Sequence, residues 1–118
     1  MTENSTSTEP LELARLALEA LSEKKANDPV ILDVRELSTV TDFFVIASGN
    51  NKPHVKAMFQ EVQHVLKQES ITAFKKVGDA DSGWLILDYV DVVIHVLLDE
   101  TRHYFAIEDL WKAAPRVE

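Results

Sequence analysis

The chain has 118 residues and a mass of 13.3 kDa, which fits one domain with a core of its own. Its 20 acidic and 12 basic residues give a net charge of -8, which argues against DNA or an anionic membrane as a partner. The sequence holds no cysteine, so it excludes disulfides, thiolate nucleophiles and Cys-ligated zinc.

The first nine residues are polar, acidic and rich in Ser and Thr. We expect residues 1–9 to form a disordered arm and residues 10–118 to form one domain. The arm has neither the basic nor the apolar region of a secretory signal. The longest apolar stretch, Val92 to Leu98, contains His95 and is too short to cross a bilayer. We therefore expect a cytoplasmic protein.

The first half of the chain predicts one helix and two strands. Apolar residues at helical spacing predict an amphipathic helix over 9–25, which Asn27-Asp28-Pro29 ends. A short strand follows over 30–34, and Ser and Thr side chains favour a loop over 37–42. The continuous apolar run over 43–47 is typical of a buried central strand.

The second half begins with a helix start signal. Asn50 or Asn51 is expected as the N-cap, Pro53 lies in the first turn, and the helix should end near Glu69. The rest of the chain predicts, in order, a weak strand over 72–77, a loop over 78–83, a hairpin of strands over 84–87 and 92–98, and a last helix over 101–113 in one or two pieces. Interleaved helices and strands predict an α/β fold with a mixed, mainly antiparallel sheet of about five strands flanked by helices.

The acidic residues are concentrated in one third of the chain. Between Val77 and Asp109 there are eight acidic residues and a single basic one, Arg102. This surplus is either a solvated rim or a docking surface for a basic partner. Trp84 and Tyr89 lie in the same segment and favour docking, because large aromatic residues anchor protein contacts.

The strand that begins at Trp84 has two apolar faces. Its period of two places Trp84, Ile86 and Asp88 on one face, and Leu85, Leu87 and Tyr89 on the other. Trp84 is then either a core residue under a helix or a residue at an exposed strand end, and the preceding Gly83 favours the exposed end.

Enzyme chemistry has little support in the residues. Asp79 and Asp81 form the only Asp-x-Asp, and Ser48-Gly49 resembles an anion cradle but has no Lys at phosphate-loop spacing. His95 is expected to be a hydrogen-bonded interior residue. We assign no catalytic residue, metal or cofactor, and keep a small Mg-dependent nucleotidyl or phosphoryl transferase as the alternative. An adaptor for another basic protein is a third reading.

Three ordered blocks resemble the ribosomal silencing factor (Iojap) family. They are Asp33 to Ser38 with Thr41 to Asn50, Trp84 to Tyr89 with Asp91 to Val96, and Thr101 to Phe105 with Leu110-Trp111. The likeness covers about residues 10–113. It implies a nucleotidyltransferase-like fold without catalytic machinery, in a non-enzymatic bacterial factor of the cytosol.

The resemblance also implies a partner and a mechanism. Members bind the large ribosomal subunit through ribosomal protein L-fourteen, a basic protein, and sterically block joining of the small subunit. Translation is thereby repressed when nutrients are limiting. Some members crystallise as homodimers, so a homodimer off the ribosome is compatible with the resemblance.

By position, the contact residues implied by the resemblance are Trp84, Leu85, Asp88, Tyr89, Val90 and Asp91. Trp84 and Tyr89 would be solvent-exposed anchors, and Asp88 and Asp91 would pair with Lys or Arg of the partner. Val90 stands where the family usually has Gly. Because Val disfavours a positive φ, either the turn differs here or the family's Gly is not needed for its backbone.

Overall fold

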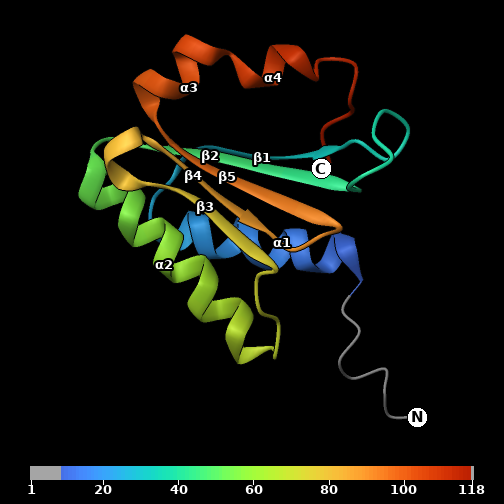
Figure 1. Cartoon of the computed structure of the whole chain (residues 1–118), viewed down its shortest axis with the longest axis horizontal. Coiled ribbons are helices and arrows are strands. Elements are labelled where there is room, and N and C mark those ends of the chain that lie inside the picture. The colour runs from blue at the N-terminus through green and yellow to red at the C-terminus, as the bar shows by residue number, and fades with distance from the viewer. Residues whose placement is uncertain (1–8, 118) are drawn as a thin grey trace.

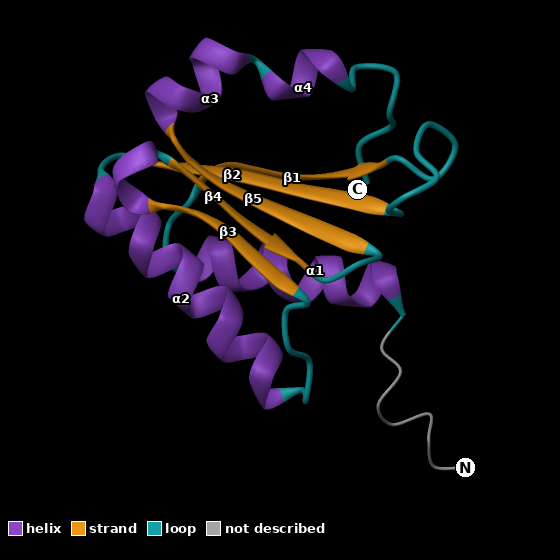
Figure 2. Cartoon of the chain, in the orientation of Figure 1, coloured by secondary structure: helices purple, strands orange, loops and turns teal. Residues whose placement is uncertain are grey.

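Five strands form one sheet, and a different pair of helices lies on each of its faces (Figures 1 and 2). The computed structural model describes residues 9–117, so most of the expected arm lies outside the described residues. In chain order the elements are α1 (Pro10–Glu23), β1 (Asn27–Asp33), β2 (Phe43–Gly49), α2 (Lys52–Gln68), β3 (Lys75–Asp79), the short 3₁₀ helix η2 (Ala80–Ser82), β4 (Trp84–Asp88), β5 (Val92–Leu98), α3 (Asp99–Phe105) and α4 (Ile107–Leu110).

The strand order is β1-β2-β5-β4-β3. Only the β2–β5 pair is parallel, and the three other pairs are antiparallel. This confirms the mixed, mainly antiparallel sheet predicted from the sequence. The kinship to nucleotidyltransferase folds stays a prediction.

Three elements differ from the predicted ones. β1 begins at Asn27 rather than at residue 30, and β3 covers 75–79 rather than 72–77. The position of β3 follows from its antiparallel register with β4, in which Lys75 pairs with Asp88 and Asp79 with Trp84. The last helix begins at Asp99 and ends at Leu110, rather than covering 101–113. Of the one or two pieces expected it has two, because Ala106 adopts a left-handed conformation with φ of 47° between α3 and α4.

Helices α1 and α2 cover one face of the sheet and form the main core with it (Figure 1). Their inward residues repeat at helical spacing, and the side chains of Leu21, Met58 and Leu66 are fully buried. Burying one such side chain contributes roughly 2 kcal/mol to the free energy of unfolding. Asn51 is the N-cap of α2, as expected, and its side chain accepts a hydrogen bond from the His54 backbone N–H.

Helices α3 and α4 cover only part of the opposite face. Ile107 packs in a second cluster with Leu32, Ile46 and Leu97, which come from β1, β2 and β5. Further along the sheet, Trp84, Ile86 and Asp88 of β4 are half-buried, and Val77 of β3, which pairs with Ile86, is 42% exposed. We call these four residues the open face.

The turn between β4 and β5 places Val90 in the left-handed region, with φ of 74°. The Asp91 N–H donates to the Tyr89 carbonyl at 2.9 Å across it, as in a γ-turn with a positive central φ. The Val90 N–H donates to Asp88 Oδ1 at 2.8 Å. The turn therefore keeps a geometry that suits Gly, and a β-branched residue is strained there.

Val90→Gly should raise the free energy of unfolding by about 1 kcal/mol, because relief of the strained φ exceeds the entropy that Gly adds to the unfolded chain. Thermal unfolding should show a melting temperature higher by about 4 °C.

Val40→Gly is the matched control, because Val40 is a loop residue that is 80% exposed and has no positive φ. It should lower the melting temperature. A Val90→Gly variant that melts below the parent would show that Val90 is not strained.

Candidate functional site

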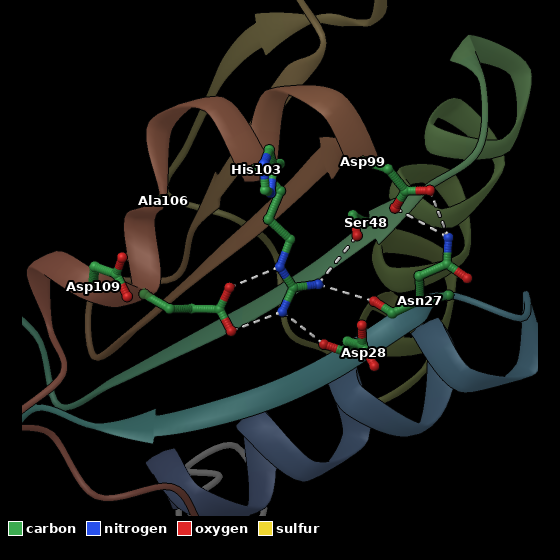
Figure 3. A pocket seen from close by; sticks show the side chains of 10 residues that line it. Asn27, Asp28, Ser48, Asp99, His103, Ala106 and Asp109 are labelled. Carbon is green, nitrogen blue, oxygen red and sulfur yellow. Dashed lines mark hydrogen bonds and ion pairs between the residues drawn. The ribbon is translucent and has the colours of Figure 1, made fainter.

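A polar cleft of about 840 Å³ lies where α3 and α4 meet β1 and β2 (Figure 3). Its lining includes Asn27, Ser48, Asp99, Arg102 and Glu108. Because it combines hydroxyl, carboxylate and guanidinium groups, it is the place where a phosphate-binding or catalytic site would be sought.

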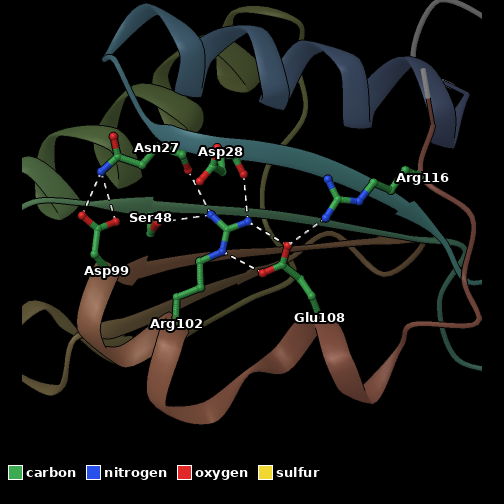
Figure 4. A network of polar contacts seen from close by, with 7 residues as sticks. All are labelled: Asn27, Asp28, Ser48, Asp99, Arg102, Glu108 and Arg116. Carbon is green, nitrogen blue, oxygen red and sulfur yellow. Dashed lines mark hydrogen bonds and ion pairs between the residues drawn. The ribbon is translucent and has the colours of Figure 1, made fainter.

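Arg102 occupies the centre of this cleft and is only 9% exposed (Figure 4). Its Nε and Nη2 atoms donate to the Glu108 carboxylate at 2.9 and 3.0 Å. Its Nη1 donates to the Asn27 carbonyl and to Ser48 Oγ, and its Nη2 also donates to the Asp28 carbonyl at 2.8 Å. The same guanidinium lowers the pKa of Glu108, mainly through its hydrogen bond.

These contacts use all five N–H donors of the guanidinium. Arg102 therefore holds α3 and α4 against β1 and β2, and it has no donor left for a phosphate. The Ser48-Gly49 turn, which resembles an anion cradle, has its groups in use as well, because Ser48 Oγ accepts from Arg102 and the Asn50 N–H donates to His54 Nδ1. The geometry gives the transferase alternative no support.

The carboxylates of Asp79 and Asp81 each contact a different neighbouring group and do not share one partner. Asp79 Oδ1 accepts from the Ser82 N–H at 2.8 Å, and Asp81 lies 3.4 Å from the Lys52 ammonium. Over residues 9–117, no three or more His, Cys, Asp or Glu side chains are grouped so that they could hold a metal ion.

The six predicted contact residues lie on different sides of the β4–β5 hairpin. Trp84 and Asp88 are half-buried on the open face, Val90 is 52% exposed at the turn, and Asp91 is exposed beside it.

Leu85 and Tyr89 are buried in the main core, at 4% and 8% exposure, because the strand alternation turns both toward α1 and α2. Burial raises the pKa of the Tyr89 phenol to about 12. The expectation that Tyr89 is a solvent-exposed anchor is therefore wrong, and Leu85 likewise presents no side chain to a partner.

Trp84 packs between β5 and α3. Its Nε1 donates to His95 Nδ1 at 3.1 Å, and its ring centroid lies 5.2 Å from that of Phe105. His95 is 7% exposed, which confirms the expected interior, hydrogen-bonded histidine. Burial lowers the pKa of His95 to about 4, so the imidazole is neutral near pH 7.

The open face continues onto α3 through two aromatic residues that the sequence argument did not assign to it. Phe105 is 51% exposed and stacks edge-on against Tyr104 at 4.9 Å, and Tyr104 is 80% exposed. We call Trp84, Ile86, Val77, Phe105 and Tyr104 the aromatic surface. Two adjacent aromatic residues in an otherwise polar helix are the signal that could have identified them.

No described helix is both long and apolar enough to cross a bilayer.

Arg102→Met should lower the free energy of unfolding by about 3 kcal/mol. It removes a donor from the Asn27 and Asp28 carbonyls and leaves the Glu108 carboxylate with only the 3.5 Å contact to Arg116. The midpoint of urea unfolding, measured at an unchanged slope, reports the loss.

Arg35→Met is the matched control. Its ion pair with Asp33 is at the surface, with the Arg35 side chain 59% exposed, and should cost less than about 1 kcal/mol. Equal losses for the two variants would contradict the role given to Arg102.

Comparison with known proteins agrees with the sequence resemblance. The family described as "Ribosomal silencing factor during starvation" matches residues 7–118. The chain is 36% identical over 107 residues to a ribosomal silencing factor of Halalkalibacterium halodurans, covering 91% of this chain and 92% of that one. It is 33% identical to the Bacillus subtilis ribosomal silencing factor, covering 87% of each chain.

A crystal structure of a Chromobacterium violaceum protein superposes with a TM-score of 0.85 at 34% identity, and the match covers 89% of this chain and 88% of that one. The match over nearly the whole length, in sequence and in fold, shows that this chain belongs to the ribosomal silencing factor (Iojap) family.

Proposed function

We propose that this protein binds the large ribosomal subunit through ribosomal protein L-fourteen and sterically blocks joining of the small subunit when nutrients are limiting. It acts in the bacterial cytoplasm, with a homodimer as its state off the ribosome. The proposal requires only that a surface be occupied, and it assigns the protein no catalytic step and no cofactor. Family membership supports the association with ribosomes and the repression of translation.

The aromatic surface is the observation that carries the proposal. It joins two exposed aromatic rings of α3 to the half-buried Trp84 and Ile86 and to Val77 at the sheet edge. Contiguous apolar patches with polar rims mark interaction sites on soluble proteins. Large aromatic side chains are also the usual anchors of such contacts.

Acidic residues at the edge of this surface favour a basic partner. Asp79 lies across from Trp84 in the β3–β4 register and is exposed, and Glu100 is exposed at the start of α3, one helical turn before Tyr104. Asp91 is exposed at the hairpin, where its carbonyl also accepts from the Asp42 and Phe43 N–H groups. Carboxylates at the rim of an apolar contact attract Lys and Arg and orient the partner.

Trp84→Ala should abolish stable co-sedimentation with large subunits in a sucrose gradient. Loss of an aromatic anchor costs about 2 kcal/mol or more, which is roughly thirtyfold in affinity. The same variant should no longer prevent purified small and large subunits from joining.

Because Trp84 is also hydrogen-bonded and packed, Tyr104→Ala provides a second variant that removes a ring with 80% exposure and little packing. It should weaken binding about tenfold while leaving the melting temperature unchanged. Leu110→Ala is the control, since Leu110 is 77% exposed on α4 outside the aromatic surface. If Trp84→Ala folds and still co-sediments like the parent, the assigned surface is wrong.

Affinity should fall as ionic strength rises, mainly through a slower association rate, because charges separated by more than about 8 Å are screened at physiological salt. Kinetic measurements on immobilised large subunits over a range of KCl concentrations test this. An association rate that does not change with salt would contradict a role for the acidic rim.

A further inference from the structure

His95 is the buried neighbour of Trp84. It lies in the middle of β5, opposite Ile86 of β4, and its ring centroid is 6.0 Å from that of Trp84. The indole N–H can only donate, so His95 Nδ1 must be the acceptor of their 3.1 Å hydrogen bond. The proton of the neutral imidazole is therefore on Nε2.

The second ring nitrogen of His95, Nε2, is in a different environment from Nδ1. His95 Nε2 is buried without a hydrogen-bond partner among the described residues, and the Phe44 ring packs edge-on against the imidazole at 5.3 Å. Burying an unpaired N–H costs free energy that an apolar side chain at this position would not cost. Packing alone therefore does not explain why position 95 is a histidine. The hydrogen bond that its Nδ1 accepts from Trp84 does explain it.

The hydrogen bond fixes the orientation of the indole. Trp84 is held by His95 on the sheet and by Phe105 on α3, whose ring is tilted at 48° to it. Its N–H edge is bonded to His95, so the part of the indole left for a partner is its apolar surface. Without this bond, the indole could turn its polar edge toward the partner or toward solvent.

We propose that His95 is a positioning residue for docking: its Nδ1 holds the Trp84 indole in the orientation that contacts the partner. This inference rests on the proposed function, because it assigns His95 a role in the same contact. His95 itself does not touch the partner, since it lies beneath the surface at 7% exposure.

The test compares three variants for binding to purified large subunits. His95→Phe keeps a ring but removes the acceptor, His95→Asn places Oδ1 near the position of Nδ1, and Trp84→Phe removes the donor. We expect His95→Phe to weaken binding about tenfold, equal to about 1.4 kcal/mol. His95→Asn should keep most of the affinity of the parent. In the Trp84→Phe background, His95→Phe should have no further effect on affinity.

A spectroscopic measurement on the free protein provides a readout that does not depend on the ribosome. The chain has two tryptophans, so a ¹H–¹⁵N spectrum holds two indole N–H signals, and Trp84→Phe assigns them. His95→Phe should shift the Trp84 signal and speed its exchange with solvent, and His95→Asn should reverse both changes. The Trp111 indole, which is separated from His95 by the Phe44 ring, should shift less and keep its exchange rate with solvent.

The outcomes separate this inference from the proposed function. If the parent does not bind large subunits, the proposed function fails and the docking role of His95 fails with it. If the parent binds, two results would show that only the positioning role is wrong. In the first, His95→Phe binds as well as the parent. In the second, His95→Phe lowers affinity as much in the Trp84→Phe background as it does in the parent. Should His95→Phe fail to fold, His95→Leu makes the same comparison with His95→Asn, because the two side chains branch alike at Cγ and only Asn carries an acceptor.

Discussion

The buried guanidinium of Arg102 decides where the second layer of this protein lies. Its five hydrogen bonds join α3 and α4 to the ends of β1 and β2, and its charge is balanced by Glu108. A buried charge that loses its partners is costly, so the two short helices are kept over β1, β2 and β5. Because they reach no further, the same face of β4 and β3 is left open to a partner.

The aromatic surface is exposed because α3 and α4 cover only part of this face of the sheet. Phe105 lies at the end of α3, where it packs against Trp84 of β4, and the left-handed Ala106 then turns the chain back toward the sheet. A continuous helix through this point would carry Ile107 and Glu108 away from β1. The break at Ala106 therefore has two consequences. It returns Ile107 to the core, and it leaves Tyr104 and Phe105 exposed.

The sequence predicted those parts of the fold that have a strong local signal, such as the apolar strands β2, β4 and β5 and the Asn51 cap of α2. β3 was misplaced because all its residues are exposed and carry no apolar pattern; only its pairing with β4 defines it. The period of two along β4 correctly places Trp84 and Tyr89 on opposite faces of the sheet. It does not predict which of the two faces α1 and α2 cover. The Arg102 cluster joins residues up to 75 positions apart, so no local pattern predicted it.

A surface that acts by occupancy benefits from being held rigid before the partner arrives, since ordering side chains on binding subtracts from affinity. Here the rigidity comes from a chain of contacts: Arg102 fixes α3, Phe105 of α3 packs on Trp84, and His95 fixes the indole from below. Tyr104, at the outer end, is 80% exposed and contacts this chain through its edge-on packing against Phe105. Under the proposed function, the Trp84 and Phe105 rings are therefore ordered before the partner arrives.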